Sequence, residues 1–250
     1  MDKRIDVTFD FTTDTPNYWE NLYAGKSGFD PDIWSPKMRE YHQLLYSRVL
    51  PNGELFDLKI GGNGKPDSYL YWKDFRFGSD SIINMYTHCD FMQNILSEIK
   101  KQKCDFKEFR EKYLRTSYTI GGEIIFPKNG TGYKSMNSAR GLSKKISDRF
   151  DLTLECIRRF YNNEDSPLTY TIEYNKNFFE LFIDFKGYVD FFYLNDLVSD
   201  DYKSVKFFLD FDNFKENPRP QTVEEWKTLY DKQMEFLSGR NDRINRMFNK

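Results

Sequence analysis

The sequence predicts a single mixed α+β domain over residues 1–250, with a strand-rich N-terminal half and a helix-rich C-terminal half. Apolar residues alternate with polar ones in several segments up to residue 126, which is typical of half-buried strands. In most segments after that point they recur at steps of three and four, which is typical of helices. No internal repeat and no Gly/Ser-rich linker divides the chain, so we expect one domain.

The N-terminal segments carry one strand signal and one helix signal. Residues 5–11 alternate Ile, Val, Phe and Phe with Asp, Thr and Asp, which predicts a strand. Ser35 and Pro36 form a favourable helix start, with serine as N-cap and proline at the first helical position. Apolar spacing then predicts a helix over residues 37–48.

Two strand-like segments, 55–60 and 69–72, follow and predict a β-hairpin with a glycine-rich loop over residues 61–67. The start of this loop, Gly-Gly-Asn-Gly-Lys, imitates a phosphate-binding loop. Pro66 and a strand follow its lysine, whereas a P-loop needs Ser or Thr and a helix there. We therefore interpret it as a hairpin loop.

The next segments lead up to the middle of the chain. Ser79 or Asp80 is expected to cap a helix that ends near residue 101. A short helix is expected over residues 106–113, and residues 118–126 predict a strand.

The C-terminal half predicts three long helical segments. The first covers residues 138–162, and the second covers 178–192, which is one helix or two because Gly187 lies in its middle. Thr222 and Glu225 form a capping box at the start of a last helix that ends near residue 247.

Composition excludes several classes of protein. The chain carries 37 Lys and Arg against 39 Asp and Glu, so it lacks the basic character of many nucleic-acid binders. Aromatic residues make up 18% and there are only two alanines, which indicates a folded core built from large side chains. At helical spacing these aromatics predict core packing more than a base-stacking surface.

The sequence also bears on the location of the protein. No apolar run approaches a membrane span and no signal peptide is visible. Three cysteines without C-x-x-C spacing predict reduced thiols, so we expect a cytoplasmic protein.

Charge is unevenly distributed along the chain. Residues 2–32 and 184–212 each carry seven acids against three bases, whereas residues 134–159 carry seven bases against three acids. The blocks either neutralise each other in the fold, or the basic block marks a site for nucleic acid or phosphate.

The candidate site is a polar cluster in the basic block, together with arginines near the C-terminus. Its members are Asn137, Arg140, Asp148, Arg149, Asp151, Glu155, Arg158, Arg159, Arg240 and Arg243. On one helix the acids from residue 148 to 155 would form a polar stripe with Arg158 and Asn162. The stripe is either a solvated, salt-bridged helix face or the wall of a cleft whose arginines bind phosphate or carboxylate.

Specific motifs are spread over nearly the whole chain. They are Asp148-Arg-Phe-Asp-Leu-Thr-Leu-Glu-Cys-Ile-Arg-Arg159 with Ser166-Pro167-Leu168, the aromatic run 178–198, Arg240-Asn241 with Arg243-Ile244, Asp30-Pro-Asp32 with Ser35-Pro36 and Tyr41-His42, Thr119-Ile-Gly-Gly122 with Phe126-Pro127, and Asn137 with Arg140-Gly141. Together they resemble a bacterial family of unknown function. The resemblance implies a single bacterial domain of about this length and supplies no activity.

Three functional hypotheses follow from these patterns. The first is recognition of a phosphate-bearing partner, a nucleotide or a nucleic acid, through the polar cluster and the C-terminal arginines. The second is a non-catalytic protein-interaction module in which the cluster is a structural ion network. The third is a Mg²⁺-dependent nuclease with Asp165, Asp184 and Lys186, although acid-x-Lys triplets occur six times in this chain.

The two histidines give little support to a metal or cofactor. His88 and Cys89 are adjacent and would point apart on a helix, so a zinc site is not expected. His42 has no local motif that would make it a catalytic partner of a cysteine. The sequence predicts no metal and no cofactor, and it leaves open whether the protein is an enzyme.

Overall fold

The computed structural model describes residues 4–61, 69–86, 94, 97 and 106–248. Its sheet has four antiparallel strands in chain order, β1 (Lys59–Ile60), β2 (Leu70–Trp72), β3 (Phe75–Ser81) and β4 (Glu123–Pro127). The longest pairing joins β3 to β4, where Gly78 lies opposite Phe126 and Asp80 opposite Ile124. The predicted α+β class is confirmed, with the sheet in the N-terminal half.

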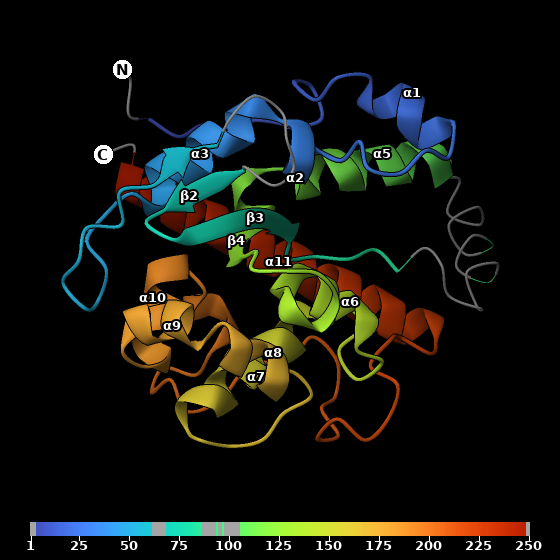
Figure 1. Cartoon of the computed structure of the whole chain (residues 1–250). Helices are drawn as coiled ribbons and strands as arrows, with labels where there is room; N and C mark the ends of the chain where they lie inside the picture. Colours follow the sequence, from blue (N-terminus) through green and yellow to red (C-terminus); the bar gives the residue numbers. More distant parts are fainter. Residues whose placement is uncertain (1–3, 62–68, 87–93, 95–96, 98–105, 249–250) are drawn as a thin grey trace.

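Helices cover the sheet on two sides (Figure 1). The N-terminal helices are α1 (Tyr18–Tyr23), α2 (Pro31–Trp34), α3 (Pro36–Tyr46) and α5 (Phe106–Ser117). The C-terminal helices are α6 (Met136–Leu142), α7 (Phe150–Tyr161), α8 (Thr169–Tyr174), α9 (Lys176–Phe179), α10 (Phe185–Phe192) and α11 (Val223–Phe248). Short 3₁₀ segments are η2 (Ile120–Gly122), η3 (Gly132–Lys134), η4 (Glu180–Phe182) and η5 (Asn195–Leu197). In Figure 1, α1, α2, α3 and α5 lie on one side of the sheet, α6 to α10 lie on the other, and α11 spans the molecule.

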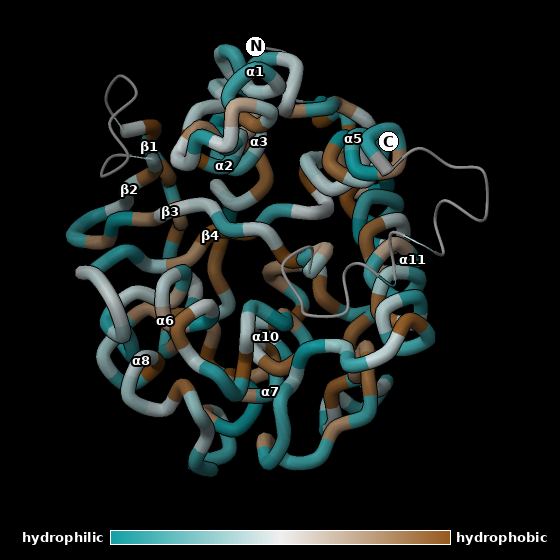
Figure 2. Tube along the Cα trace, turned by 90° about the vertical axis from the view of Figure 1, so that its right-hand side faces the viewer, coloured by the Kyte–Doolittle hydropathy of each residue, from teal (hydrophilic) through white to brown (hydrophobic). Residues whose placement is uncertain are grey.

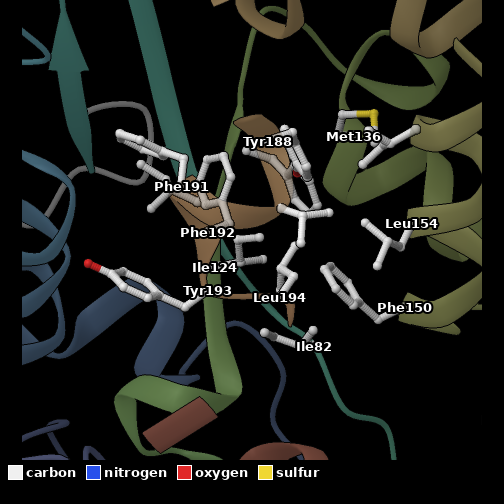
Figure 3. Close-up of a cluster of buried hydrophobic side chains, with 14 of the residues drawn as sticks. Ile82, Ile124, Met136, Phe150, Leu154, Tyr188, Phe191, Phe192, Tyr193 and Leu194 are labelled. Carbon is white, nitrogen blue, oxygen red and sulfur yellow. The ribbon is translucent and has the colours of Figure 1, made fainter. Parts of the chain in front are cut away.

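The core lies where the C-terminal helices meet the sheet. Figure 3 shows Phe192 and Leu194, at and just after the end of α10, packed beside Ile124 of β4 and Phe150 of α7. All four side chains are fully buried. Figure 2 shows hydrophobic segments running through the middle of the molecule. The aromatic run therefore forms core, as its spacing predicts.

The two helix starts with capping signals are confirmed. The Ser35 hydroxyl accepts a hydrogen bond from the Met38 amide at 3.0 Å, and α3 begins at Pro36. At the start of α11, Thr222 accepts from the Glu225 amide at 3.1 Å. These signals are local, so the sequence alone places them well.

The strand predicted over residues 5–11 is wrong, because this segment forms turns. The Asp6 carboxylate accepts from the Thr8 amide and the Asp10 carboxylate accepts from the Thr12 amide, both at 2.9 Å. These Asx turns bend the chain although Ile5 and Phe11 are still buried.

The helix predicted to start at Ser79 or Asp80 is also wrong at its start. Both residues lie in β3, where they pair with β4 across more than forty residues of sequence. Residues 94 and 97 are helical, and the rest of 87–105 lies outside the described residues, as does loop segment 62–68. The hairpin is confirmed in shorter form, since β1 covers only 59–60 and pairs with β2.

The helix predicted over residues 138–162 is two helices, α6 and α7. The first helix ends at Leu142, where Ser143 is extended, and Ser147 and Asp148 then adopt left-handed backbone angles, with φ of 46° and 60°, before α7 begins. The run 178–192 also divides in two, but the break is at Ile183 (φ 70°) and Gly187 lies inside α10.

Two shorter elements lie close to their predicted positions. The strand predicted over 118–126 begins as η2 and becomes β4 at Glu123, and the helix predicted over 106–113 extends to Ser117. Within the described residues, no helix is long and apolar enough to cross a membrane.

Candidate functional site

Most of the arginines in the predicted cluster use their donors inside the protein. Arg149 is 2% exposed and binds the fully buried Asp151 with two nitrogens, at 3.2 and 2.5 Å. The same Asp151 carboxylate accepts from the Phe208 amide at 2.9 Å, and Arg149 donates to the Pro218 carbonyl at 3.0 Å. This pair attaches the start of α7 to the loop that precedes α11.

A second ion cluster lies further along α7. Glu155 is 4% exposed and accepts from Arg158 and Arg159, each at 2.8 Å. Arg158 also pairs with Glu164 at 3.1 Å, and Arg159 donates to the Asp165 carbonyl at 3.1 Å. The second hypothesis combines a structural ion network with a role in protein interaction. The burial of these groups is what a structural ion network requires, and it does not identify a protein partner.

The C-terminal arginines lie away from both clusters. Arg240 is fully buried and donates to backbone carbonyls, and Arg243 pairs with Asp196 at 2.7 Å on the surface of α11. Asp148 lies in the loop before α7, so the polar stripe expected from residue 148 onward does not include it.

Three predicted residues, Asn137, Arg140 and Asp148, do come together, at a cavity of about 840 Å³. Asn137 and Asp148 line it, whereas Arg140 is 1% exposed and supports the wall from behind. Arg140 forms an ion pair with Asp80 and donates to the Asp148 carbonyl at 3.2 Å. It also donates to Thr153 of α7 at 3.1 Å.

The walls of this carboxylate cavity come from four distant parts of the chain. They are Asp30 and Asp32 at α2; Asp80 and Ser81 at the end of β3, with Ile83, Asn84 and Met85 after it; Arg110, Tyr113, Leu114, Ser117 and Tyr118 at α5; and Gly132, Asn137, Ser138, Gly141, Leu142 and Asp148 around α6. Four aspartates thus face one arginine in the lining. The segments Asp30-Pro-Asp32, Asn137, Arg140-Gly141 and Asp148 all belong to the motifs that carry the family resemblance.

Three polar atoms on these walls have no hydrogen-bond partner among the residues that the structure describes. They are Asp32 Oδ1, Asn137 Oδ1 and the hydroxyl of Tyr113, whose side chain is only 3% exposed. The amide nitrogen of Asn137 is used, because it donates to the Ser79 carbonyl at 2.6 Å. An unpaired buried polar atom costs about 1–3 kcal/mol, so such atoms in a cavity wall indicate contact with a ligand or solvent.

Burial and neighbouring negative charges disfavour the charged forms of Asp32, Asp80 and the nearby Glu123. Burial first, then the charges of Asp30 and Asp80, raises the pKa of Asp32 well above its usual value. Burial raises the pKa of Asp80 to about 6, against the opposing effect of Arg140. Burial and the charge of Asp32 likewise raise the pKa of Glu123, which lies buried behind the wall. Perturbed carboxyls gathered at a cavity are typical of functional sites.

The backbone around Asp148 is adapted to this arrangement. Asp148 and Ser147 hold left-handed angles that non-glycine residues rarely adopt. A Cβ atom at Gly141 would lie 3.1 Å from the Asp148 carboxylate, so glycine leaves room for that group at the cavity.

Sequence reasoning missed the aspartates from the N-terminal half. Asp30 and Asp32 stand in a recognised motif but carried no site signal of their own, and Asp80 was expected to cap a helix. Their place at the cavity depends on the tertiary fold, which packs α2 against β3.

The other predicted groups are not arranged for the chemistry that was considered. Asp184 caps α10 by accepting from the Gly187 amide at 2.7 Å, and Lys186 pairs with Asp190. No group of three or more His, Cys, Asp or Glu in the described parts of the chain could hold a metal ion. Burial and Arg240 lower the pKa of His42 to about 3, so its ring is neutral. His88 and Cys89 lie outside the described residues.

The fold and the cavity define an α+β protein with a carboxylate-lined cavity between its sheet and the surrounding helices. The chain belongs to a family of unknown function, DUF6994, whose model matches residues 5–244. This confirms the resemblance over nearly the whole chain. No curated protein and no solved structure matches it.

Proposed function

We propose that this protein binds a small organic cation, a molecule with one or more ammonium groups, in the carboxylate cavity. The observation that carries the proposal is the pair of unpartnered acceptors, Asp32 Oδ1 and Asn137 Oδ1, on walls with four aspartates and one arginine. An ammonium group donates up to three hydrogen bonds, and its positive charge would pair with the carboxyl groups of the lining.

The cavity suits an organic molecule better than a bare ion. Its volume of about 840 Å³ lies within the range of small-molecule sites, about 300–1,000 Å³. The described carboxyls are not grouped to hold a metal ion. A phosphate or carboxylate ligand would find only one cationic side chain in the lining, Arg110, against four aspartates.

Thermal unfolding at pH 8 with putrescine, agmatine or spermidine tests the proposal. At 100 times the dissociation constant, a ligand stabilises the folded state by about 2.7 kcal/mol. For a chain of this size that raises the melting temperature by about 5–11 °C. We expect at least one amine to do so, and succinate at the same ionic strength to have no such effect.

Two variants show whether the cavity is responsible. Asp32→Asn should abolish the shift caused by the amine, whereas Asp200→Asn, at an exposed acid outside the cavity, should keep it. If no amine shifts the melting temperature, or if Asp32→Asn retains the full shift, the proposal is wrong.

A further inference from the structure

A basic groove lies where the loop between α6 and α7 meets the loop before α11. Its lining contains Lys144, Lys145, Lys215 and Arg219, with Glu216 as the one acid, and its volume is about 490 Å³. All four basic side chains are exposed. The groove shares no lining residue with the carboxylate cavity.

The four cations of the groove differ from the arginines of residues 134–159, the basic block that supplies Lys144 and Lys145. Arg140, Arg149 and Arg158 each form an ion pair. In the part of the chain that the structure describes, none of the four groove cations has a carboxylate partner within 4 Å. The positive block of residues 134–159 is therefore divided, with Arg140 and Arg149 buried and Lys144 and Lys145 exposed at the surface.

Hydrogen bonds hold the two loops in a fixed arrangement. Lys145 donates to the Lys215 carbonyl, and the Asp212 carboxylate accepts from the amides of Lys215 at 3.1 Å and Glu216 at 2.5 Å. Beneath them, buried Arg149 donates to the Pro218 carbonyl at 3.0 Å. The ion pair of Arg149 with Asp151 thus positions the loop that carries Arg219.

We propose that this groove binds the phosphate groups of a nucleotide or of a nucleic-acid strand. Four exposed cations in a lining whose one carboxylate is Glu216, with Asp212 beside it, favour an anion with several charges. Phosphate groups accept hydrogen bonds from ammonium and guanidinium groups. The proposal is independent of cation binding in the carboxylate cavity. It keeps the partner expected from the basic block and assigns contact to exposed lysines and to Arg219.

Fluorescence anisotropy of a labelled single-stranded RNA dodecamer and of a duplex DNA, at 50 mM salt, tests the groove. Four phosphate contacts predict that log K falls against log salt with a slope of about −2.8 for the single strand. The exposed substitutions Lys144→Gln and Lys145→Gln together should reduce that slope by about 1.4 and weaken binding. Lys26→Gln, at an exposed lysine outside the groove, should change neither.

Competition identifies the source of the phosphate. Displacement of the RNA by ATP at micromolar concentration supports a nucleotide site, and binding that ATP leaves intact supports a nucleic-acid strand. If neither oligonucleotide binds, equilibrium dialysis with ATP shows whether the groove binds a nucleotide. Absence of binding to RNA, DNA and ATP, or equal affinity in a variant with all four cations changed to Gln, overturns the proposal. Asp32→Asn should leave phosphate binding unchanged even if amine binding is lost.

Discussion

Arg240 offers the sharpest test of how this fold is held together. It lies fully buried on α11, and its guanidinium donates to the carbonyls of Gly121 (2.7 Å), Glu123 (2.8 Å) and Phe192 (3.2 Å) and to the Tyr46 hydroxyl (2.9 Å). One side chain therefore joins α11 to η2, β4, α10 and α3.

Arg240→Met keeps most of the side-chain length and removes every donor. Four buried acceptors then lose a partner, and each such loss costs about 1–3 kcal/mol. Removing the buried charge returns its desolvation cost, so we expect a net loss of about 3–5 kcal/mol, as when one partner of a buried polar pair is removed. At about 2–4 °C per kcal/mol for a chain of this size, the melting temperature should fall by roughly 6–20 °C.

Thermal unfolding followed by circular dichroism measures this loss, with Arg243→Met as the matched control. Arg243 lies one turn further along α11, but its side chain is 32% exposed and its partner Asp196 36%. Such a pair contributes about 0–1 kcal/mol. If the two variants melt at the same temperature, or if Arg240→Met melts with the wild type, the assigned role of Arg240 is refuted.

Three further predictions concern single residues. Because the pKa of Asp32 is raised in the folded protein, ionising Asp32 at a pH above its unfolded pKa destabilises the native state. Asp32→Asn removes this cost, so urea titrations should show a higher free energy of unfolding for the variant at pH 8 and no gain near pH 4. Gly122→Ala would place a Cβ 1.8 Å from the Ser117 carbonyl oxygen, so we expect a large fall in melting temperature, and a wild-type value would contradict the packing. Burial raises the pKa of the Cys156 thiol to about 12, so a disulfide reagent should modify it only in denaturant, and rapid labelling of the native Cys156, identified by mass spectrometry of the modified peptide, would count against its burial.

Local signals in the sequence were sufficient for part of the fold. Ser35 before Pro36 and Thr222 before Glu225 mark helix starts with side chains that bind neighbouring amides. Aromatic spacing over 178–192 identified core because burial on a helix repeats every three to four residues.

The remaining elements depend on contacts that a local pattern does not contain. After Phe77, β3 contains no apolar residue. It forms a strand because it pairs with β4, which follows more than forty residues later in the chain. The connection between α6 and α7, residues 143–149, contains no glycine or proline that would mark it as a break in the helix. At the carboxylate cavity, Asn137 was predicted as a site residue, whereas Asp32 reaches the cavity only through the tertiary fold.

Isothermal titration calorimetry of the stabilising amine, at pH 8 in two buffers with different ionisation enthalpies, tests the central claim most directly. Cation binding should favour the charged form of Asp32, whose pKa is raised in the free protein. We expect one amine per chain, with any protons exchanged on binding released rather than taken up, and loss of binding in Asp32→Asn. Absence of binding heat in both buffers, or binding to Asp32→Asn with wild-type affinity, would contradict cation binding at this cavity.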